Sequence, residues 1–164
     1  MSADGIKIRG DITIRMIEVA TGRVLQQVDV RNAIMQKGLE GIAKLLTQNS
    51  GSADSWKISG LCAGTGSDAA SSSQLSMTGT EKWYTALSAA NREIIAGPPL
   101  VISFSAQVVG IPAGKVLTEA GLFLNDGAGT VASPGTMFAR QIHAPVQTAA
   151  GVVPDYLWRI TLTA

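Results

Sequence analysis

The sequence predicts a mainly β protein: an antiparallel β-sandwich or jelly-roll-like fold with one α-helix after the first hairpin, in a single domain over residues 1–164. Three observations lead to this prediction. Segments with apolar residues at every second position recur along the chain, as in strands that bury one face. A single segment carries apolar residues at helical spacing. The regular alternation of strand and helix that is typical of nucleotide-binding folds does not occur.

The composition fits one domain and excludes some functions. A chain of 164 residues with 46% hydrophobic residues can fill a core. Charged residues make up 15%, below the usual quarter, and the net charge is +1. This balance offers no basic face for a phosphate backbone, so we expect no nucleic-acid binding. A surface of low charge favours contact with other proteins, and a soluble monomer with an inert surface is the alternative.

The single cysteine and the absence of long apolar runs limit where the chain works. Cys62 cannot form an internal disulfide or a cysteine zinc site, and we expect it to pack as a small apolar residue. No apolar run reaches the length of a membrane span, and residues 1–5 lack the pattern of a signal peptide. The expectation is synthesis and folding in a cytoplasm.

The first two strands are predicted to form a hairpin. Apolar residues stand at even positions from Ile6 to Met16, with polar residues between them. Gly10 interrupts this alternation and is interpreted as a bulge. A turn at residues 20–23 leads into a second strand over residues 24–30.

A helix is predicted over residues 32–48. Asn32 is placed to cap its first turn, and apolar residues recur from Met35 to Leu46 at spacings of three and four. Gly38 and Gly41 weaken a helix, and they are explained if a neighbouring element packs closely there.

The remaining elements are predicted as strands and loops. Strands are expected over residues 56–63, 100–108, 116–124, 136–143 and 156–163. Loops are expected over residues 67–76, 125–135 and 149–154. Residues 78–95 suit either a helix or an extended segment, and the pattern does not decide between them.

The strand over residues 116–124 carries apolar residues on both faces, so we expect it to be covered on both. Glu119 lies in this strand, and Arg140 lies in the similarly apolar strand 136–143. A buried charge normally needs an opposite one. We therefore predict that the two strands are neighbours and that Glu119 pairs with Arg140, within one chain or across a subunit boundary. The alternative is that each side chain reaches solvent at a strand edge.

The sequence contains no recognisable catalytic, cofactor or metal motif. His143 is the single histidine and is predicted to lie at the surface or in an interface. The segment Gly64-Thr65-Gly66 lacks the lysine and the helix of a phosphate-binding loop, so a tight turn is favoured. The acidic residues around Asp126 are too few for a calcium loop. We assign no catalytic, cofactor or metal residues and expect no enzyme activity.

The order of several segments resembles a group of small structural proteins from tailed bacteriophages. The segments that carry this resemblance are Asn32-Ala-Ile, Gly38 to Leu46, Gly64-Thr-Gly66, Leu75, Asn91-Arg-Glu-Ile94, Ile102-Ser-Phe104, Thr118 to Phe123, Met137-Phe-Ala-Arg140 and Trp158-Arg-Ile-Thr-Leu162. They cover most of the chain after residue 28. Each segment alone is a weak signal, and their order is more specific.

The resemblance implies a non-enzymatic virion protein, made in the cytoplasm of the host bacterium. A capsid decoration or cement protein that stabilises the head shell comes first, with the major capsid protein as its partner. The alternative is a tail, baseplate, collar or fibre-attachment component that contacts other tail proteins. A glycan-binding or hydrolase module on the virion is a third reading. Apolar area on both faces of the central strand also leads us to expect a homo-oligomer.

Overall fold

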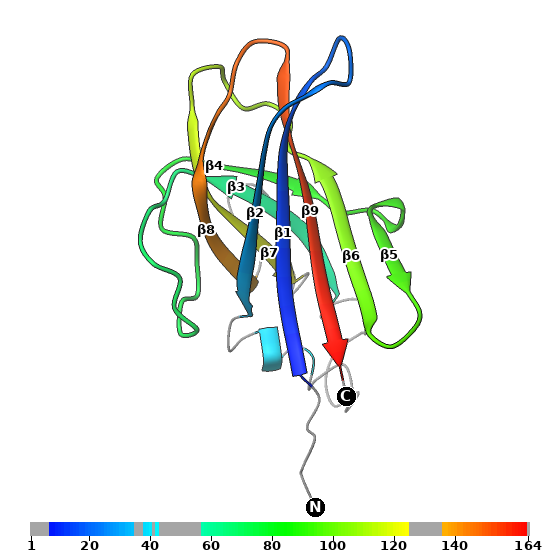
Figure 1. Cartoon of the computed structure of the whole chain (residues 1–164). Helices are drawn as coiled ribbons and strands as arrows, with labels where there is room; N and C mark the ends of the chain where they lie inside the picture. The colour runs from blue at the N-terminus through cyan, green and yellow to red at the C-terminus, as the bar shows by residue number, and fades with distance from the viewer. Residues whose placement is uncertain (1–6, 35–37, 41, 43–56, 125–135, 164) are drawn as a thin grey trace, which may run out of the picture.

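The computed structural model describes residues 7–34, 38–40, 42, 57–124 and 136–163, and it is mainly β (Figure 1). A short helix includes residues 38–40 and 42, and a single 3₁₀ turn, η2, spans Ala89–Asn91. The strands within these ranges are β1 (Lys7–Glu18), β2 (Val24–Ile34), β3 (Ile58–Gly64), β4 (Lys82–Ala86), β5 (Arg92–Ile95), β6 (Leu100–Gln107), β7 (Val116–Leu124), β8 (Met137–Gln147) and β9 (Val152–Thr163).

All strand pairs are antiparallel, and the strands follow the order β4-β3-β7-β8-β2-β1-β9-β6-β5. The order divides into two sheets. Sheet A contains β2, β1, β9, β6 and β5, and sheet B contains β4, β3, β7 and β8. The end of β2 joins them, because Ala33 and Ile34 pair with Arg140 and Ala139 of β8.

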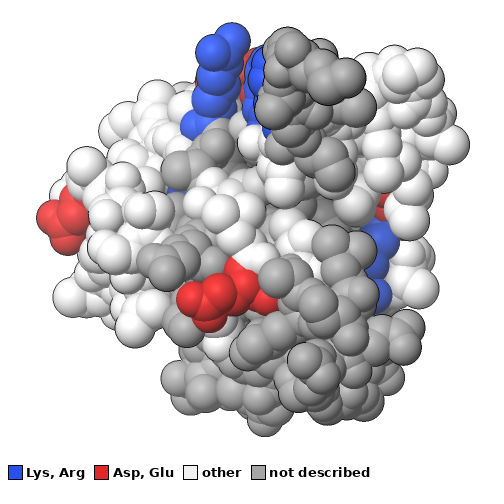
Figure 2. Space-filling view, turned by 90° about the horizontal axis from the view of Figure 1, so that it is seen from below, with Lys and Arg blue, Asp and Glu red and all other residues white. Residues whose placement is uncertain are grey.

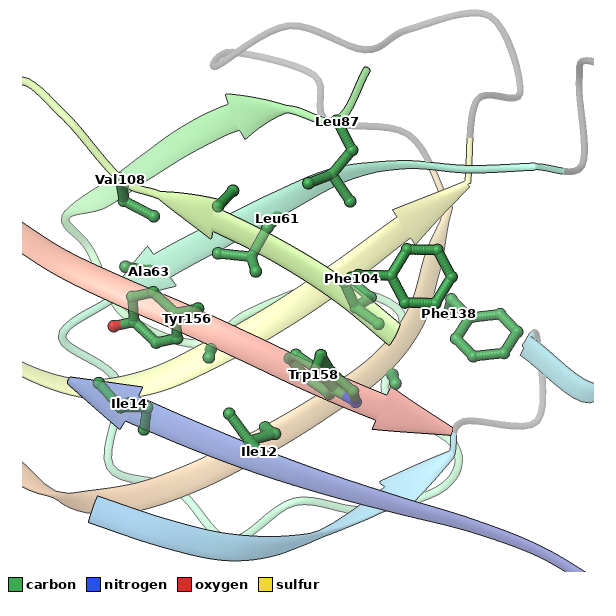
Figure 3. Close-up of a cluster of buried hydrophobic side chains, with 14 of the residues drawn as sticks. Ile12, Ile14, Leu61, Ala63, Leu87, Phe104, Val108, Phe138, Tyr156 and Trp158 are labelled. Carbon is green, nitrogen blue, oxygen red and sulfur yellow. The ribbon is translucent and has the colours of Figure 1, made fainter. Parts of the chain in front are cut away.

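One apolar cluster lies between the two sheets (Figure 3). Ile12 and Ile14 of β1 and Trp158 of β9 supply it from sheet A, and Leu61 and Leu122 supply it from sheet B. These side chains are buried almost completely. The alternating burial along β1 is the pattern expected of a strand with one face against a core, so the hairpin predicted from residues 6–30 is confirmed.

The helix begins later than the sequence predicted. Asn32 is not a helix cap: it lies in β2, opposite Gly10 of β1. Pairing of this strand with both β1 and β8 overrides the local capping preference. Most of the predicted helix 32–48 falls outside the described residues, as does Gly41. The expected close neighbour at Gly38 is confirmed, since a Cβ there would lie 2.3 Å from the Phe138 carbonyl oxygen.

Two further expectations are corrected, and one alternative that the sequence left open is decided. Gly10 keeps regular register with both neighbouring strands, and the irregularity of this hairpin lies instead between Met16 and Ile17. The last loop is shorter than predicted, because β9 begins at Val152, where it pairs with Glu18. Residues 78–95 are extended, with η2 between β4 and β5. The predicted loop 125–135 lies outside the described residues.

The strand predicted over residues 116–124 is β7, and it is covered on both faces as expected. Its inner face meets the cluster between the sheets. Its outer face meets a second cluster formed by Cys62, Met77, Phe123 and Met137. Met77 comes from the loop 65–81, so this loop covers the outer face of sheet B. None of the helices within the described ranges is long and apolar enough to cross a membrane.

Candidate functional site

The two charged residues singled out from the sequence meet on the outer face of sheet B. β7 and β8 are neighbours, with Glu119 opposite Ile142 and Gly121 opposite Arg140. Residues that face each other across a ladder point to the same side of a sheet. Glu119 and Arg140 are therefore diagonal neighbours on one face, close enough for their long side chains to meet.

The ion pair is fully buried within one chain. Arg140 Nε donates to Glu119 Oε2 at 2.9 Å, and Arg140 Nη2 lies 2.8 Å from the same oxygen. Both side chains have a solvent-exposed fraction of 0%. The structure thus brings the two residues together in the intrachain arrangement, and neither reaches solvent at a strand edge.

The Glu119 carboxylate also binds the backbone of the loop 65–81. Its Oε1 accepts hydrogen bonds from Gly79 N at 2.7 Å and from Gly66 N at 3.1 Å. Its Oε2 accepts a further bond from Thr78 N at 3.2 Å. A carboxylate removed from water is tolerated when such donors replace the lost hydration.

The Arg140 guanidinium binds the same loop through its other nitrogen atoms. Nη1 donates to the Asp68 carbonyl oxygen at 3.0 Å and to Gln74 Oε1 at 2.8 Å. Nη2 donates to Thr78 Oγ1 at 2.8 Å. Every nitrogen of the guanidinium therefore has an oxygen partner, which a buried arginine requires. The pair fastens both halves of the loop to the sheet.

Two loop positions must be glycine for the loop to come this close. A Cβ at residue 66 would lie 2.5 Å from Glu119 Cδ, and one at residue 79 would lie 2.6 Å from Glu119 Oε1. Both distances are shorter than real carbon contacts allow. The backbone N–H groups reach the carboxylate because no side chain intervenes.

The outer apolar cluster lies beside the ion pair, since side-chain atoms of Met77 and Glu119 both lie close to Gly64. Cys62 is 2% exposed, and burial raises the pKa of its thiol to about 12. A thiol with such a pKa is unreactive near neutral pH, since the thiolate is the nucleophile. The expectation that Cys62 packs as an apolar residue is confirmed.

This arrangement supports a structural use of the pair. The carboxylate is closed to water, and its oxygens are occupied by the guanidinium and by three backbone amides. No group of three metal-binding side chains gathers within the parts of the chain that the structure describes. The ion pair therefore serves to hold the loop 65–81 against sheet B.

His143 is placed differently from the prediction. It is 5% exposed rather than at the surface, and its ring lies edge-on to Tyr156 with the ring centres 6.3 Å apart. His143 lies on β8 and Tyr156 on β9, so the imidazole sits between the sheets. Burial lowers the pKa of His143, and the nearby Ala144 carbonyl opposes this only in part. Polar residues interrupt the alternation of apolar and polar residues in the sequence of β8. The sequence therefore did not predict on which face of the strand the His143 ring lies.

The sequence identified the ion pair but not its loop partners. Gln74 lies in the segment 67–76, which the sequence predicts only as a loop, and Thr78 lies in the segment 78–95, for which the sequence leaves helix and extended chain open. Gly64-Thr65-Gly66 was interpreted as a tight turn, whereas Gly66 N binds the carboxylate. The one available signal was the pair of glycines at residues 66 and 79, on either side of a loop opposite an acidic strand residue.

Comparison with protein-family models, with curated proteins and with solved structures finds no match to this chain. The resemblance to virion proteins of tailed bacteriophages therefore stays a prediction, and the site is interpreted from its own geometry.

The first prediction concerns the ion pair. Glu119→Gln and Arg140→Met should each lower the free energy of unfolding by about 3–5 kcal/mol, because each leaves the other charge buried without its partner. The double variant should lose less than the sum of the two single losses. Denaturant unfolding of the unchanged protein, the two single variants and the double variant measures these free energies. Lys115→Met, which breaks the partly exposed pair with Glu81, is the control and should cost less than about 1 kcal/mol. Small additive losses would contradict the coupling.

The second prediction concerns the loop contacts. Gly66→Ala should destabilise the protein by about 1–3 kcal/mol, because the added methyl group collides with the Glu119 side chain. The loop 65–81 should also exchange its amide hydrogens faster, as measured by hydrogen-exchange mass spectrometry. Ser72→Ala, at an exposed position of the same loop, is the control and should change neither quantity. Unchanged exchange in Gly66→Ala would show that the carboxylate does not hold the loop.

The third prediction concerns pH. The pKa of His143 is lower in the folded protein than in the unfolded chain. As the pH falls, the unfolded chain therefore binds a proton at His143 before the folded chain does. Stability should therefore be unaffected by this group at higher pH and should fall as the pH drops through about 6.5, the ordinary histidine value. Unfolding measured between about pH 7.5 and pH 5.5 should show this slope, and His143→Leu should reduce it. An equal slope in both proteins would exclude His143 as its source.

Proposed function

We propose that this chain is a non-enzymatic structural protein of a tailed-bacteriophage virion, acting as a capsid decoration or cement protein that contacts neighbouring shell subunits. The proposal rests on the ion pair between Glu119 and Arg140, which is the one fully buried ion pair among the residues that the structure describes. The pair holds a loop against a sheet and leaves no polar atom directed to a substrate. Rigidity of this kind suits a protein whose task is to hold other proteins together.

The strand connectivity supports a jelly-roll-like sandwich for this role. β1 pairs with β9, β2 with β8 and β3 with β7, so the pairs are nested as in a hairpin rolled upon itself. Apolar residues of both sheets share one cluster between them. Such folds are common among viral structural proteins.

One end of the molecule offers a surface for partner proteins. We call it the turn end: it contains the β1–β2 turn, the β6–β7 loop and the β8–β9 turn, at the top of Figure 1. Hydrogen bonds tie these turns together, from Val19 N to the Gly151 oxygen at 2.8 Å and from Gly114 N to the Thr148 oxygen at 2.8 Å. The turn end is thus a connected surface of three turns.

The turn end exposes large apolar side chains. The most exposed are Val109 and Val19, at 64% and 62%. Val24, Leu25 and Val116 are also exposed there. Their position on three connected turns at one end of the molecule supports the proposal that this end contacts other proteins.

The charges near the turn end are largely paired within the chain. Arg23 lies beside Glu18, and Arg15 lies beside Asp155. Figure 2 shows the opposite end, where charged side chains form small separate groups on a mostly uncharged described surface. A surface of this character suits apolar contacts between proteins more than it suits nucleic acid.

The fourth prediction tests the turn end as the binding surface. The double variant Val19→Asp with Val109→Asp should bind phage particles lacking this protein at least about tenfold more weakly, because each change buries a charge at the contact. Leu39→Asp, at an exposed apolar position in the short helix, is the matched control and should bind as the unchanged protein does. Binding is measured by co-sedimentation, after circular dichroism shows that the variants fold. Normal binding of the double variant would exclude this surface.

The location of the bound protein separates head from tail. Electron microscopy of complete particles should show many copies in proportion to the capsid subunits if the decoration role is right. A single small ring of copies at the tail would replace it with the tail-component role. Light scattering of the purified chain tests the expected homo-oligomer in the same preparation.

A further inference from the structure

The strand order has two terminal strands, β4 and β5, and only one edge of each is paired among the described residues. An unpaired strand edge presents backbone N–H and C=O groups that can pair with another chain. Proteins protect such edges by covering them or by placing lysine, proline or a bulge there. The two edges of this protein differ in this respect.

The β4 edge is partly closed. Residues 82–85 of this strand are half-buried, and the strand begins with Lys82. Thr85 Oγ1 donates a hydrogen bond to the carbonyl oxygen of Gln107, the last residue of β6, at 3.3 Å. This edge of sheet B is therefore held close to the end of sheet A.

The β5 edge is open. β5 lies at the margin of the molecule in Figure 1, with no described strand beyond it. Its register with β6 is regular, and it contains neither lysine nor proline. Glu93, Ile94 and Ile95 are exposed. At 70%, Ile94 has the largest exposed fraction of any large apolar side chain that the structure describes.

We propose that β5 pairs with β5 of a second copy of this chain, in an antiparallel arrangement around a two-fold axis. Such an axis makes both copies use the same surface. The pairing joins the two copies of sheet A into one continuous sheet. It occupies both β5 edges, and the β4 edges are partly closed, so the association ends at two copies.

The side chains of β5 select the register of this pairing. Opposite residues of an antiparallel pair share one face of the sheet, so a two-fold axis sets one residue of β5 opposite its own copy. Arg92 or Glu93 at this position would bring like charges together, which is destabilising. Ile94 at this position brings apolar side chains together and sets Glu93 opposite Ile95 of the second copy. An axis at Ile95 would instead set Glu93 opposite Gly97, beyond the end of the strand.

The inner face of β5 gains apolar contact in this register. Ile94 and its ladder partner Ile102 line an apolar cavity between the two sheets. In the dimer, the two copies of Ile94 cover each other beside this cavity and leave water. Because β5 has four residues, the contact is small, and we expect the association to be weak.

This inference does not depend on the proposed virion role, and β5 shares no residue with the turn end. Sedimentation velocity of the purified chain measures the association. We expect the average mass to rise from the monomer toward the dimer between about 10 μM and about 1 mM.

Two variants locate the contact. Ile94→Lys should keep the chain monomeric over the same concentrations, because it sets two like charges opposite each other. Leu75→Lys makes the same change at a position of similar exposure, 67%, in the loop 65–81. This matched control should dimerise as the unchanged protein does. Thermal unfolding of each variant checks that it is folded.

Cysteine cross-linking tests the register. Opposite Cα atoms of an antiparallel pair lie within the span of a disulfide, about 4.4–6.8 Å. Ile94→Cys should therefore form a covalent dimer when oxidised with copper phenanthroline. Glu93→Cys should not, since the two copies of residue 93 lie more than about 7 Å apart in this register. Cys62 does not compete, because its thiol is buried.

Several results would overturn the proposal. They are a chain that stays monomeric at about 1 mM, and a dimer that Ile94→Lys leaves intact. Equal cross-linking of Ile94→Cys and Glu93→Cys would also overturn it, because it would exclude the register. A dimer with the expected cross-link that fails to bind phage particles would confirm the pairing and reject only the virion role.

Discussion

The energetic cost of burying the Glu119 carboxylate determines much of this structure. A charge with no access to water must receive an opposite charge and a full set of hydrogen bonds, or the folded state loses much of its stability. Arg140 supplies the charge, and the amides of Gly66, Thr78 and Gly79 supply the remaining donors. These amides belong to a loop with little regular structure of its own. The carboxylate therefore acts as the template on which that loop is ordered.

This requirement explains why sheet B is covered on both sides. The inner face of β7 contributes to the apolar cluster between the sheets. The outer face would otherwise expose Phe123 and Met137 to water. The loop 65–81 covers them with Met77, and its polar groups are satisfied by the ion pair at the same time. Apolar burial and charge neutralisation are thus achieved by one segment.

The sequence predicted the parts of the fold that depend on local patterns. Strict alternation gave the hairpin of β1 and β2, and apolar residues on both faces identified β7 as a covered strand. The same pattern placed Glu119 and Arg140 where a buried charge needs a partner. The failures came where distant contacts override local preference. Asn32 has the chemistry of a helix cap, yet β1 and β8 hold its segment in a sheet. The loop partners of the ion pair were also hidden, because a backbone amide has no signature in a sequence.

The strand order also sets a constraint on the timing of folding. β9 lies between β1 and β6 in sheet A and pairs with β1 along its whole length, from Lys7–Thr163 to Glu18–Val152. Contacts between segments so far apart in the chain are slow to form, since a long loop must close first. During synthesis on a ribosome, β1 and β6 emerge well before the strand that joins them. The backbone N–H and C=O groups on the edges that pair with β9 stay unpaired until this strand is made, so a chain interrupted before it would expose strand edges prone to aggregation.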